Sequence, residues 1–157
     1  MDTEIIKYTA LQREQIIEVW ERSVRATHKF VSVEDIEYFK KIVKNIDFSS
    51  FEVYCLILNK KVLGFVGVAD RSIEMLFLDP DFIGQGYGKK LISFAIDKLN
   101  AAGVTVNEQN ELAVAFYKKN GFLTYERMEK DEEGKNYPIL KMKLPEKESQ
   151  LTIDTQN

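Results

Sequence analysis

The feature that most constrains the fold is an abrupt change of the sequence pattern between residues 78 and 89. Three apolar β-type runs stand in close succession before it, and Asp79-Pro80-Asp81 ends the last of them, because proline cannot continue an interior strand. The run Gly84-Gln85-Gly86-Tyr87-Gly88 follows at once, and an amphipathic helical pattern comes after it. The chain therefore passes here from an antiparallel meander into a strand–helix–strand crossover. This order favours an α/β fold with a mixed sheet, not a doubly wound one.

Hydrophobic periodicity predicts the elements on both sides of this break. Thr9 and Ser32 are expected to cap the first two helices, and Gly121 to end the last one. A polar turn is expected at Asp131–Lys135, and the short connection Asn59-Lys60 indicates a hairpin. The expected strands are Glu4–Tyr8, Phe51–Leu58, Lys61–Ala69, Ile73–Leu78, Val104–Val106, Phe122–Met128 and Tyr137–Leu144, and the expected helices are Leu11–His28, Val33–Val43, Lys89–Leu99 and Asn110–Asn120.

Length and composition argue against several classes of function. The 157 residues fit one domain, which we assign to residues 1–145, with a polar tail over 146–157. A net charge of −3, from 22 basic and 25 acidic residues, argues against nucleic acid or an anionic membrane as partner and favours a cationic substrate such as an amine. With one cysteine and one histidine, neither an internal disulfide nor a Cys/His zinc site is possible, and no metal is expected. The absence of a signal-peptide or membrane-helix pattern leads us to expect a cytoplasmic monomer or homodimer.

The glycine cluster is the strongest candidate for a binding site. A glycine-rich turn from a strand into a helix leaves backbone N–H groups at the positive end of the helix dipole, which suits a phosphate group. The two commoner phosphate patterns, G-x-G-x-x-G and G-x-x-x-x-G-K-[ST], both fail because Lys89 stands where a glycine is required. From these residues alone, a tight turn with no ligand stays open as an alternative.

Two motifs in register strongly resemble the GNAT N-acetyltransferase superfamily. The segment Phe77–Ile92 resembles its acetyl-coenzyme A loop, and Asn110-x-x-Ala113-x-x-Phe116-Tyr117-x-x-x-Gly121-Phe122 resembles its second signature. The stretches Arg22–Phe30, Val106–Asn110 and Gly134–Pro138 are similar to the bacterial YjaB-like acetyltransferases, which are associated with protein-lysine acetylation.

One position departs from the superfamily pattern. Its loop usually opens with arginine or glutamine, where this chain has Ile83, and we expect Lys89 or Lys90 to supply compensating charge.

The resemblance implies a GNAT-like mixed, mostly antiparallel sheet of the seven expected strands, flanked by four helices, with a splay between the fourth and fifth strands. Acetyl-coenzyme A would pair with the backbone of the fourth strand as a further strand would. The residues implied in cosubstrate binding are Leu76, Phe77, Leu78, Gly84, Gln85, Gly86, Tyr87, Gly88, Lys89, Asn110 and Tyr117.

The resemblance, taken with the chemistry of amide formation, implies the catalytic groups. Tyr117 is the expected general acid for the departing thiolate, since a phenol keeps its proton at neutral pH. A half-buried tyrosine that caps the core, and a helix N-cap for Asn110, are the alternatives. The base is left open among Glu74, His28 and ordered water or backbone. The alternatives without a catalytic role are a solvated glutamate for Glu74 and a cationic histidine at a helix C-terminus for His28.

These residues predict direct transfer of acetyl from acetyl-coenzyme A to a primary amine. A protein lysine is one candidate acceptor, and segments Arg25–Val33 and Met128–Tyr137 are expected to select it. Cys55 is not expected to act as a nucleophile, because it lies in an apolar strand with no histidine near it in the sequence. A small-molecule amine acetyltransferase, or a non-catalytic acyl-coenzyme A sensor, remain the alternatives.

Overall fold

The structure is a computed structural model that describes residues 2–146. The chain divides after Val104 into two compact units. Apart from Glu146, the expected polar tail lies outside the described residues, and the single domain over 1–145 stays a prediction. Within the described range, no helix is both long enough and apolar enough to cross a membrane.

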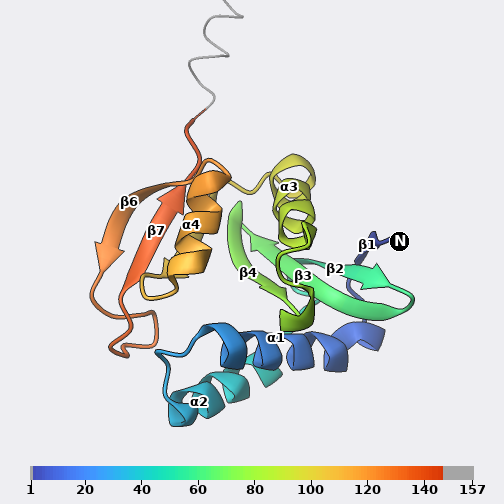
Figure 1. Cartoon of the computed structure of the whole chain (residues 1–157), viewed down its shortest axis with the longest axis horizontal. Coiled ribbons are helices and arrows are strands. Elements are labelled where there is room, and N and C mark those ends of the chain that lie inside the picture. Colours follow the sequence, from blue (N-terminus) through green and yellow to red (C-terminus); the bar gives the residue numbers. More distant parts are fainter. Residues whose placement is uncertain (1, 147–157) are drawn as a thin grey trace, which may run out of the picture. The chain divides into compact units, whose positions relative to one another are not determined.

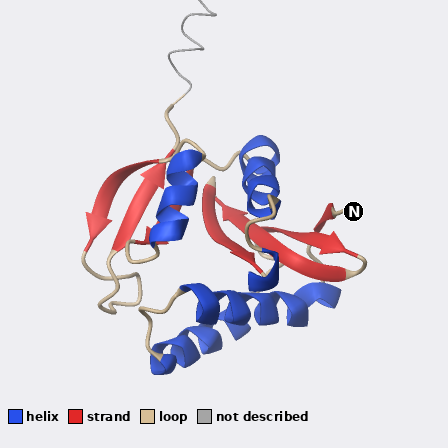
Figure 2. Cartoon of the chain, in the orientation of Figure 1, coloured by secondary structure: helices blue, strands red, loops and turns tan. Residues whose placement is uncertain are grey.

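The first unit is a sheet covered by helices on both faces (Figure 1). Strands β1 to β4 pair as successive antiparallel neighbours, and β5 joins β4 in parallel. Helices α1 and α2 lie on one face, and α3 lies on the other (Figure 2). The elements are β1 (Glu4–Lys7), the 3₁₀ turn η1 (Ala10–Gln12), α1 (Arg13–Thr27), α2 (Val33–Lys44), β2 (Glu52–Leu58), β3 (Lys61–Ala69), β4 (Ser72–Leu78), the 3₁₀ turn η2 (Pro80–Phe82), α3 (Tyr87–Leu99) and β5 (Gly103–Asn107).

The second unit takes the remainder of β5 and continues the strand order as β5-β7-β6. It contains α4 (Glu111–Lys119), β6 (Leu123–Met128) and β7 (Ile139–Lys143). Strands β6 and β7 are antiparallel, and the turn between them is closed by the Asp131 carboxylate, which accepts from the N–H groups of Glu133 and Lys135. The predicted mixed sheet, with its antiparallel meander and parallel crossover, is confirmed.

Apolar faces of α1 and α2 bury against one face of the first unit's sheet. Ile16, Trp20 and Val24 recur every four residues on α1, so they share one side of the helix. Each of them is at most 6% exposed, and burial of this kind is the main stabilising contribution to such a fold. They belong to one cluster of buried residues: Ile16, Val19, Trp20, Val24, Ile36, Val43, Phe48, Val53, Cys55, Ile57, Val62, Phe65 and Met75.

Two helix starts differ from the sequence predictions by two residues. Thr9 forms a capping box with Gln12, as expected for a cap, but the first turn is 3₁₀ and α1 begins only at Arg13. Helix α3 begins at Tyr87 and not at Lys89. The reason is that Gly86 adopts a left-handed φ of 87° as the N-cap, so the chain turns into the helix immediately after it. Ser32 caps α2 as predicted, by accepting from the N–H of Asp35.

A test of this packing uses two glycines of β3. A Cβ on Gly64 would lie 2.7 Å from the Phe77 carbonyl oxygen, which is backbone of β4 and cannot swing away. A Cβ on Gly67 would lie 2.7 Å from a ring atom of Phe51, which is half-buried and can turn. We expect Gly64→Ala to lower the free energy of unfolding by about 1–3 kcal/mol, and Gly67→Ala to lower it less. Urea denaturation of both variants measures the difference, and an equal loss would contradict this account of β4.

Candidate active site

Strand β4 has one backbone edge that is only partly used. Among the described residues, its parallel pairing with β5 joins Ser72 to Gly103 and Ile73 to Val104. Over the rest of the strand, the pairings found among the described residues are all with β3, and they continue to Leu78. The predicted cosubstrate residues Leu76, Phe77 and Leu78 lie on this second half. Their outward backbone groups are therefore placed as an extended, amide-containing ligand would need them.

A β-bulge lies where the pairing with β5 stops. Met75 pairs with Gly67 and Ile73 pairs with Val68, so Glu74 is the extra residue on β4. A bulge bends its strand and increases the local twist, which explains why β4 leaves its parallel neighbour at this point. The Glu74 side chain is exposed. The predicted base candidate thus stands at the point where the open edge begins.

A buried carboxylate anchors the turn that follows β4. Asp79 is 2% exposed, and its carboxylate accepts from the N–H of Asp81 and from the Arg22 guanidinium at 3.0 Å. Arg22 is on α1, and its second nitrogen donates to the Asp81 carboxylate at 3.1 Å. These contacts, which we call the Arg22 clasp, fasten α1 to the start of the glycine loop.

Sequence patterns did not predict the Arg22 clasp, because its partners are 57 and 59 residues apart in the chain. The available signal was the Asp-Pro step. Aspartate before a turn often accepts from its own backbone two residues on, and a carboxylate so placed at a strand end needs a cation when it is buried.

The glycine loop fits the phosphate-binding prediction. Gly84 and Gly86 have φ values of 84° and 87°, and a Cβ on either would meet no atom within 4 Å. The backbone conformation at these two positions favours glycine, and the absence of side chains leaves open space beside the loop. In the described part of the chain, no backbone acceptor bonds the N–H groups of residues 84–88, which lead into the first turn of α3. Unpaired donors and open space at a helix N-terminus are what a pyrophosphate requires.

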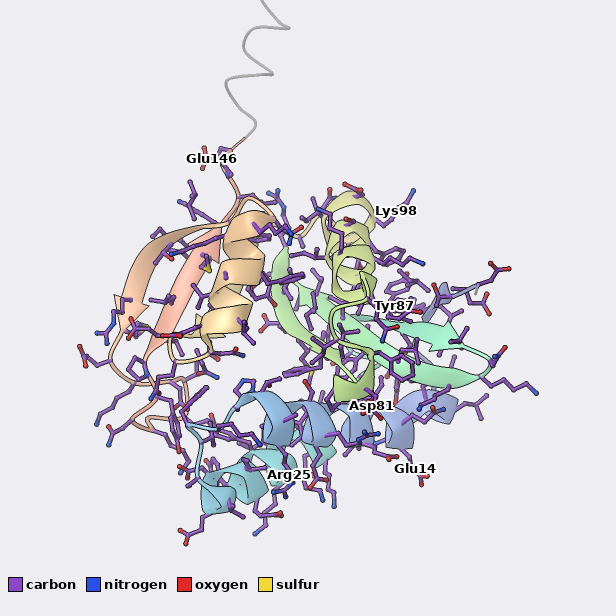
Figure 3. The ribbon with its side chains drawn as sticks, viewed as in Figure 1. Glu14, Arg25, Asp81, Tyr87, Lys98 and Glu146 are labelled. Atoms are coloured by element: carbon purple, nitrogen blue, oxygen red, sulfur yellow. The ribbon has the colours of Figure 1, made fainter. Side chains whose placement is uncertain are left out.

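The side chains around the loop differ in their exposure and in their contacts. Ile83, which replaces the usual polar residue, is 48% exposed. The Lys90 amine donates to the Thr3 hydroxyl at 2.9 Å and lies 5.7 Å from the centre of the Tyr87 ring. Lys89 is exposed in the first turn of α3. Figure 3 shows Asp81 near η2 and Tyr87 near the start of α3, at the two ends of this loop.

In the second unit, α4 carries both residues of the second motif. The Asn110 side-chain oxygen accepts from the N–H of Ala113 at 3.2 Å, so Asn110 is the N-cap that the residues alone allowed. Tyr117 is 6% exposed and packs edge-on against the rings of Phe116 and Phe122. Burial raises the pKa of the Tyr117 phenol, so it keeps its proton throughout the physiological range.

His28 ends α1 and is held by its neighbours. Its backbone N–H closes the helix on the Val24 carbonyl, its Nδ1 lies 2.8 Å from the Thr27 hydroxyl, and its ring is 5.3 Å from that of Phe30. Burial lowers the pKa of His28 to about 4. Burial thus favours a neutral imidazole at pH 7, which argues against the alternative of a cationic histidine at the helix C-terminus.

These features define an α/β protein with a phosphate-type turn placed directly after an open strand edge. Comparison with known proteins identifies its family. The chain belongs to the GNAT acetyltransferases, since the family model described as "Acetyltransferase (GNAT) domain" matches residues 13–145.

Individual relatives agree with this family. The chain is 37% identical to the peptidyl-lysine N-acetyltransferase YjaB of Escherichia coli, over 82% of this chain and 88% of that protein. It is 36% identical to YjaB of Salmonella typhimurium, over 84% of this chain and 91% of that protein.

Solved structures agree as well. The solution structure of apo-form YjaB from E. coli matches with a TM-score of 0.83 at 33% identity, over 91% of this chain and 97% of that one. The PaiA N-acetyltransferase of Thermoplasma acidophilum, solved in complex with coenzyme A, shares the fold with a TM-score of 0.70 at 24% identity, over 91% of this chain and 99% of that one.

The two carboxylates that contact Arg22 provide one test of the clasp. Asp79→Ala removes a buried acceptor that caps η2, and we expect the free energy of unfolding to fall by about 1–3 kcal/mol. Asp81→Ala removes the partner whose side chain is 70% exposed, and should cost less than half as much. Urea denaturation compares the two variants. Equal effects would show that the clasp does not depend on the buried carboxylate.

A second test concerns the loop. Gly86→Asp adds a negative charge beside the proposed pyrophosphate position, and calorimetric titration with coenzyme A should show at least a tenfold loss of affinity. Gly134→Asp is the matched control, since Gly134 also has a positive φ of 77° and open space around its Cβ position. It imposes similar backbone strain in the β6–β7 connection and should leave coenzyme A affinity unchanged. Unchanged affinity in Gly86→Asp would place the cosubstrate elsewhere.

Proposed function

We propose that this GNAT acetyltransferase transfers acetyl from acetyl-coenzyme A directly to the side-chain amine of a protein lysine. The observation that carries the proposal is the open second half of β4, which leads through a clasped turn into the glycine loop. The peptidyl-lysine activity of relatives that are 36% and 37% identical supports the acceptor. The net charge of −3 is also compatible with a cationic acceptor.

Acetyl-coenzyme A supplies an activated thioester, and the protein's share is to bind and orient it. We assign the pyrophosphate to backbone N–H groups of Gly84 to Lys89, and the amides of the pantetheine arm to the backbone of Leu76, Phe77 and Leu78. Among the described residues, no backbone acceptor bonds the N–H groups of Gly84 to Gly88, and Leu76, Phe77 and Leu78 pair with β3 on one edge. Orientation of two reactants in this way accelerates a reaction without any special side chain.

Tyr117 is the proposed acid for the departing thiolate. An alkyl thiol has a pKa of about 8.5, so its thiolate can accept a hydrogen bond, and then the proton, of a positioned donor as the C–S bond breaks. Burial raises the pKa of Tyr117, so the phenol carries its proton at neutral pH and can hydrogen-bond the departing sulfur. Asn110 remains a proposed cosubstrate contact.

We propose different roles for Glu74 and His28 at the acceptor amine. Glu74 stands at the bulge, where the part of β4 assigned to the cosubstrate begins, and this position supports it as the group that takes the proton of the ammonium group. His28, whose pKa burial lowers to about 4, is neutral at pH 7 and can accept a hydrogen bond from the amine. We therefore assign proton removal to Glu74, and contact with the amine to His28.

Direct transfer is supported by the state of Cys55. This thiol is fully buried, and burial raises its pKa to about 12, so it carries almost no thiolate at neutral pH. An acetyl-cysteine intermediate on this residue therefore has no support.

The test is intact mass spectrometry of acceptors incubated with the protein and acetyl-coenzyme A. The panel pairs a folded lysine-rich protein and a lysine peptide with spermidine and an aminoglycoside. We expect acetyl groups on protein lysine, and a drop in turnover of roughly 10²–10⁴-fold in Tyr117→Phe at unchanged coenzyme A affinity.

Two results would contradict parts of this proposal. Acetylation of spermidine or the aminoglycoside alone would replace the protein acceptor by a small amine, and coenzyme A binding without transfer to any acceptor would indicate a sensor. Full activity in Tyr117→Phe would show that the thiolate takes its proton from water. Phe116→Leu, a change on the same helix with no hydroxyl involved, controls for packing.

A further inference from the structure

The C-terminal end of α1 contains a hydrogen-bond chain of three neighbouring groups. The Thr27 hydroxyl donates to the carbonyl oxygen of Ser23, one turn earlier, at 2.7 Å. The same hydroxyl lies 2.8 Å from Nδ1 of His28. Ser23 is 5% exposed, so this carbonyl is shielded from competing water.

The number of hydrogens in these hydrogen bonds determines which ring nitrogen of the imidazole carries the proton. A threonine hydroxyl has one hydrogen, and the Ser23 carbonyl can only accept, so that hydrogen is used at Ser23. The contact with His28 must then be an Nδ1–H group that donates to the hydroxyl oxygen. A neutral imidazole carries one N–H, so Nε2 holds a lone pair.

Two further observations concern the state and orientation of the ring. Burial lowers the pKa of His28 to about 4, so the neutral form with its lone pair is the one present at pH 7. The Phe30 ring packs against the imidazole with an interplanar angle of 41°. The imidazole is thus restrained at Nδ1 by Thr27 and on its ring by Phe30, which leaves Nε2 as the acceptor that a ligand could use.

The position of His28 relates it to the cosubstrate loop. Arg22, on the same helix, is clasped to Asp79 and Asp81 at the end of β4. His28 follows six residues later, which is about 9 Å along the helix axis. The helix that fastens the loop therefore also presents the restrained imidazole.

We propose that Thr27 is a positioning residue that holds His28 as its Nδ1–H tautomer, so that Nε2 accepts a hydrogen bond from the acceptor amine. The proposal rests on the proposed function, because it names the group that contacts the amine. No covalent bond forms at His28: Nε2 holds one N–H of the amine while the nitrogen lone pair attacks the thioester carbonyl. Thr27 acts only through His28.

The tautomer can be observed directly because the chain contains a single histidine. In protein labelled with ¹⁵N at histidine, two-dimensional NMR at pH 7 should show Nδ1 protonated and Nε2 unprotonated. The same sample titrated with acid should become doubly protonated with a midpoint near 4. A predominant Nε2–H tautomer in the unmodified protein would overturn the proposal without any measurement of activity.

Two variants separate positioning from a structural role. Thr27→Val keeps the branched shape and removes the hydroxyl, so the Nε2–H tautomer should gain population and the KM for a lysine peptide should rise at least tenfold. Thr27→Ser restores the hydroxyl and should restore both readouts, and the KM for acetyl-coenzyme A should stay unchanged in both. An unchanged tautomer in Thr27→Val, or no recovery in Thr27→Ser, would contradict the role of the hydroxyl.

The amine contact has its own readout. With coenzyme A present, N-α-acetyl-lysine amide should shift the Nε2 resonance of the unmodified protein in a saturable way, and it should not do so in Thr27→Val. Absence of a shift in the unmodified protein would refute the amine contact even if the tautomer is as proposed. If no acceptor in the mass-spectrometry panel is acetylated, the proposed function fails, while the tautomer result still decides the role of Thr27.

Discussion

The hydrogen bonding of β4 is the constraint on which the rest of the site depends. An interior strand normally uses both backbone edges, because buried N–H and C=O groups without partners are costly. Within the part of the chain that the structure describes, β4 pairs with β3 from Ser72 to Leu78 around the bulge, and its pairing with β5 joins Ser72 to Gly103 and Ile73 to Val104. The bulge at Glu74 gives the physical reason, since the extra residue bends the strand away from its parallel neighbour. The remaining backbone groups are then available to a ligand that offers amides of its own.

A strand with one open edge needs to be held from elsewhere, and the first unit does this in two ways. Phe77 and Met75 pack with the cluster of buried residues under α1 and α2. Beyond Leu78, the Arg22 clasp joins α1 to the buried Asp79 carboxylate. Asp79 also donates its backbone N–H to the Leu63 carbonyl at 2.7 Å, which ties the turn to β3. The loop is thus fixed at its start, while Gly84 and Gly86 stay in open space. An anion site built from backbone needs this combination of fixed geometry and free donors.

The parts of this structure that could be predicted from sequence are those with a local signal. Alternating and helical periodicity predicted the element order, and the caps Thr9, Ser32 and Gly121 followed from residue type. The start of α3 was wrong by two residues, because the left-handed conformation of Gly86 moves the first helical residue to Tyr87. The bulge at Glu74 had no local signal, and the Asp-Pro step indicated only the carboxylate side of the Arg22 clasp. The clasp depends on a contact between residues far apart in the chain, and the bulge depends on the register of β3 against β4. The proton arrangement at His28 likewise depends on where the Thr27 hydroxyl points, which residue type alone does not determine.

Burial moves the pKa values of Tyr117 and His28 away from neutrality, although the two side chains are proposed to act at different steps of the reaction. It raises the pKa of the Tyr117 phenol and lowers the pKa of the His28 imidazole, because in each case desolvation penalises the charged form. Both groups are therefore neutral at pH 7, one with a proton to give and the other with a lone pair to offer. A free tyrosine and histidine have pKa values of about 10 and 6.5, so each shift moves the titration further from neutrality. Neither group then changes charge in the range where a lysine peptide begins to lose its proton. It follows that, between pH 7 and 9, the rising limb of activity should follow the ionisation of the acceptor amine itself and not that of Tyr117 or His28.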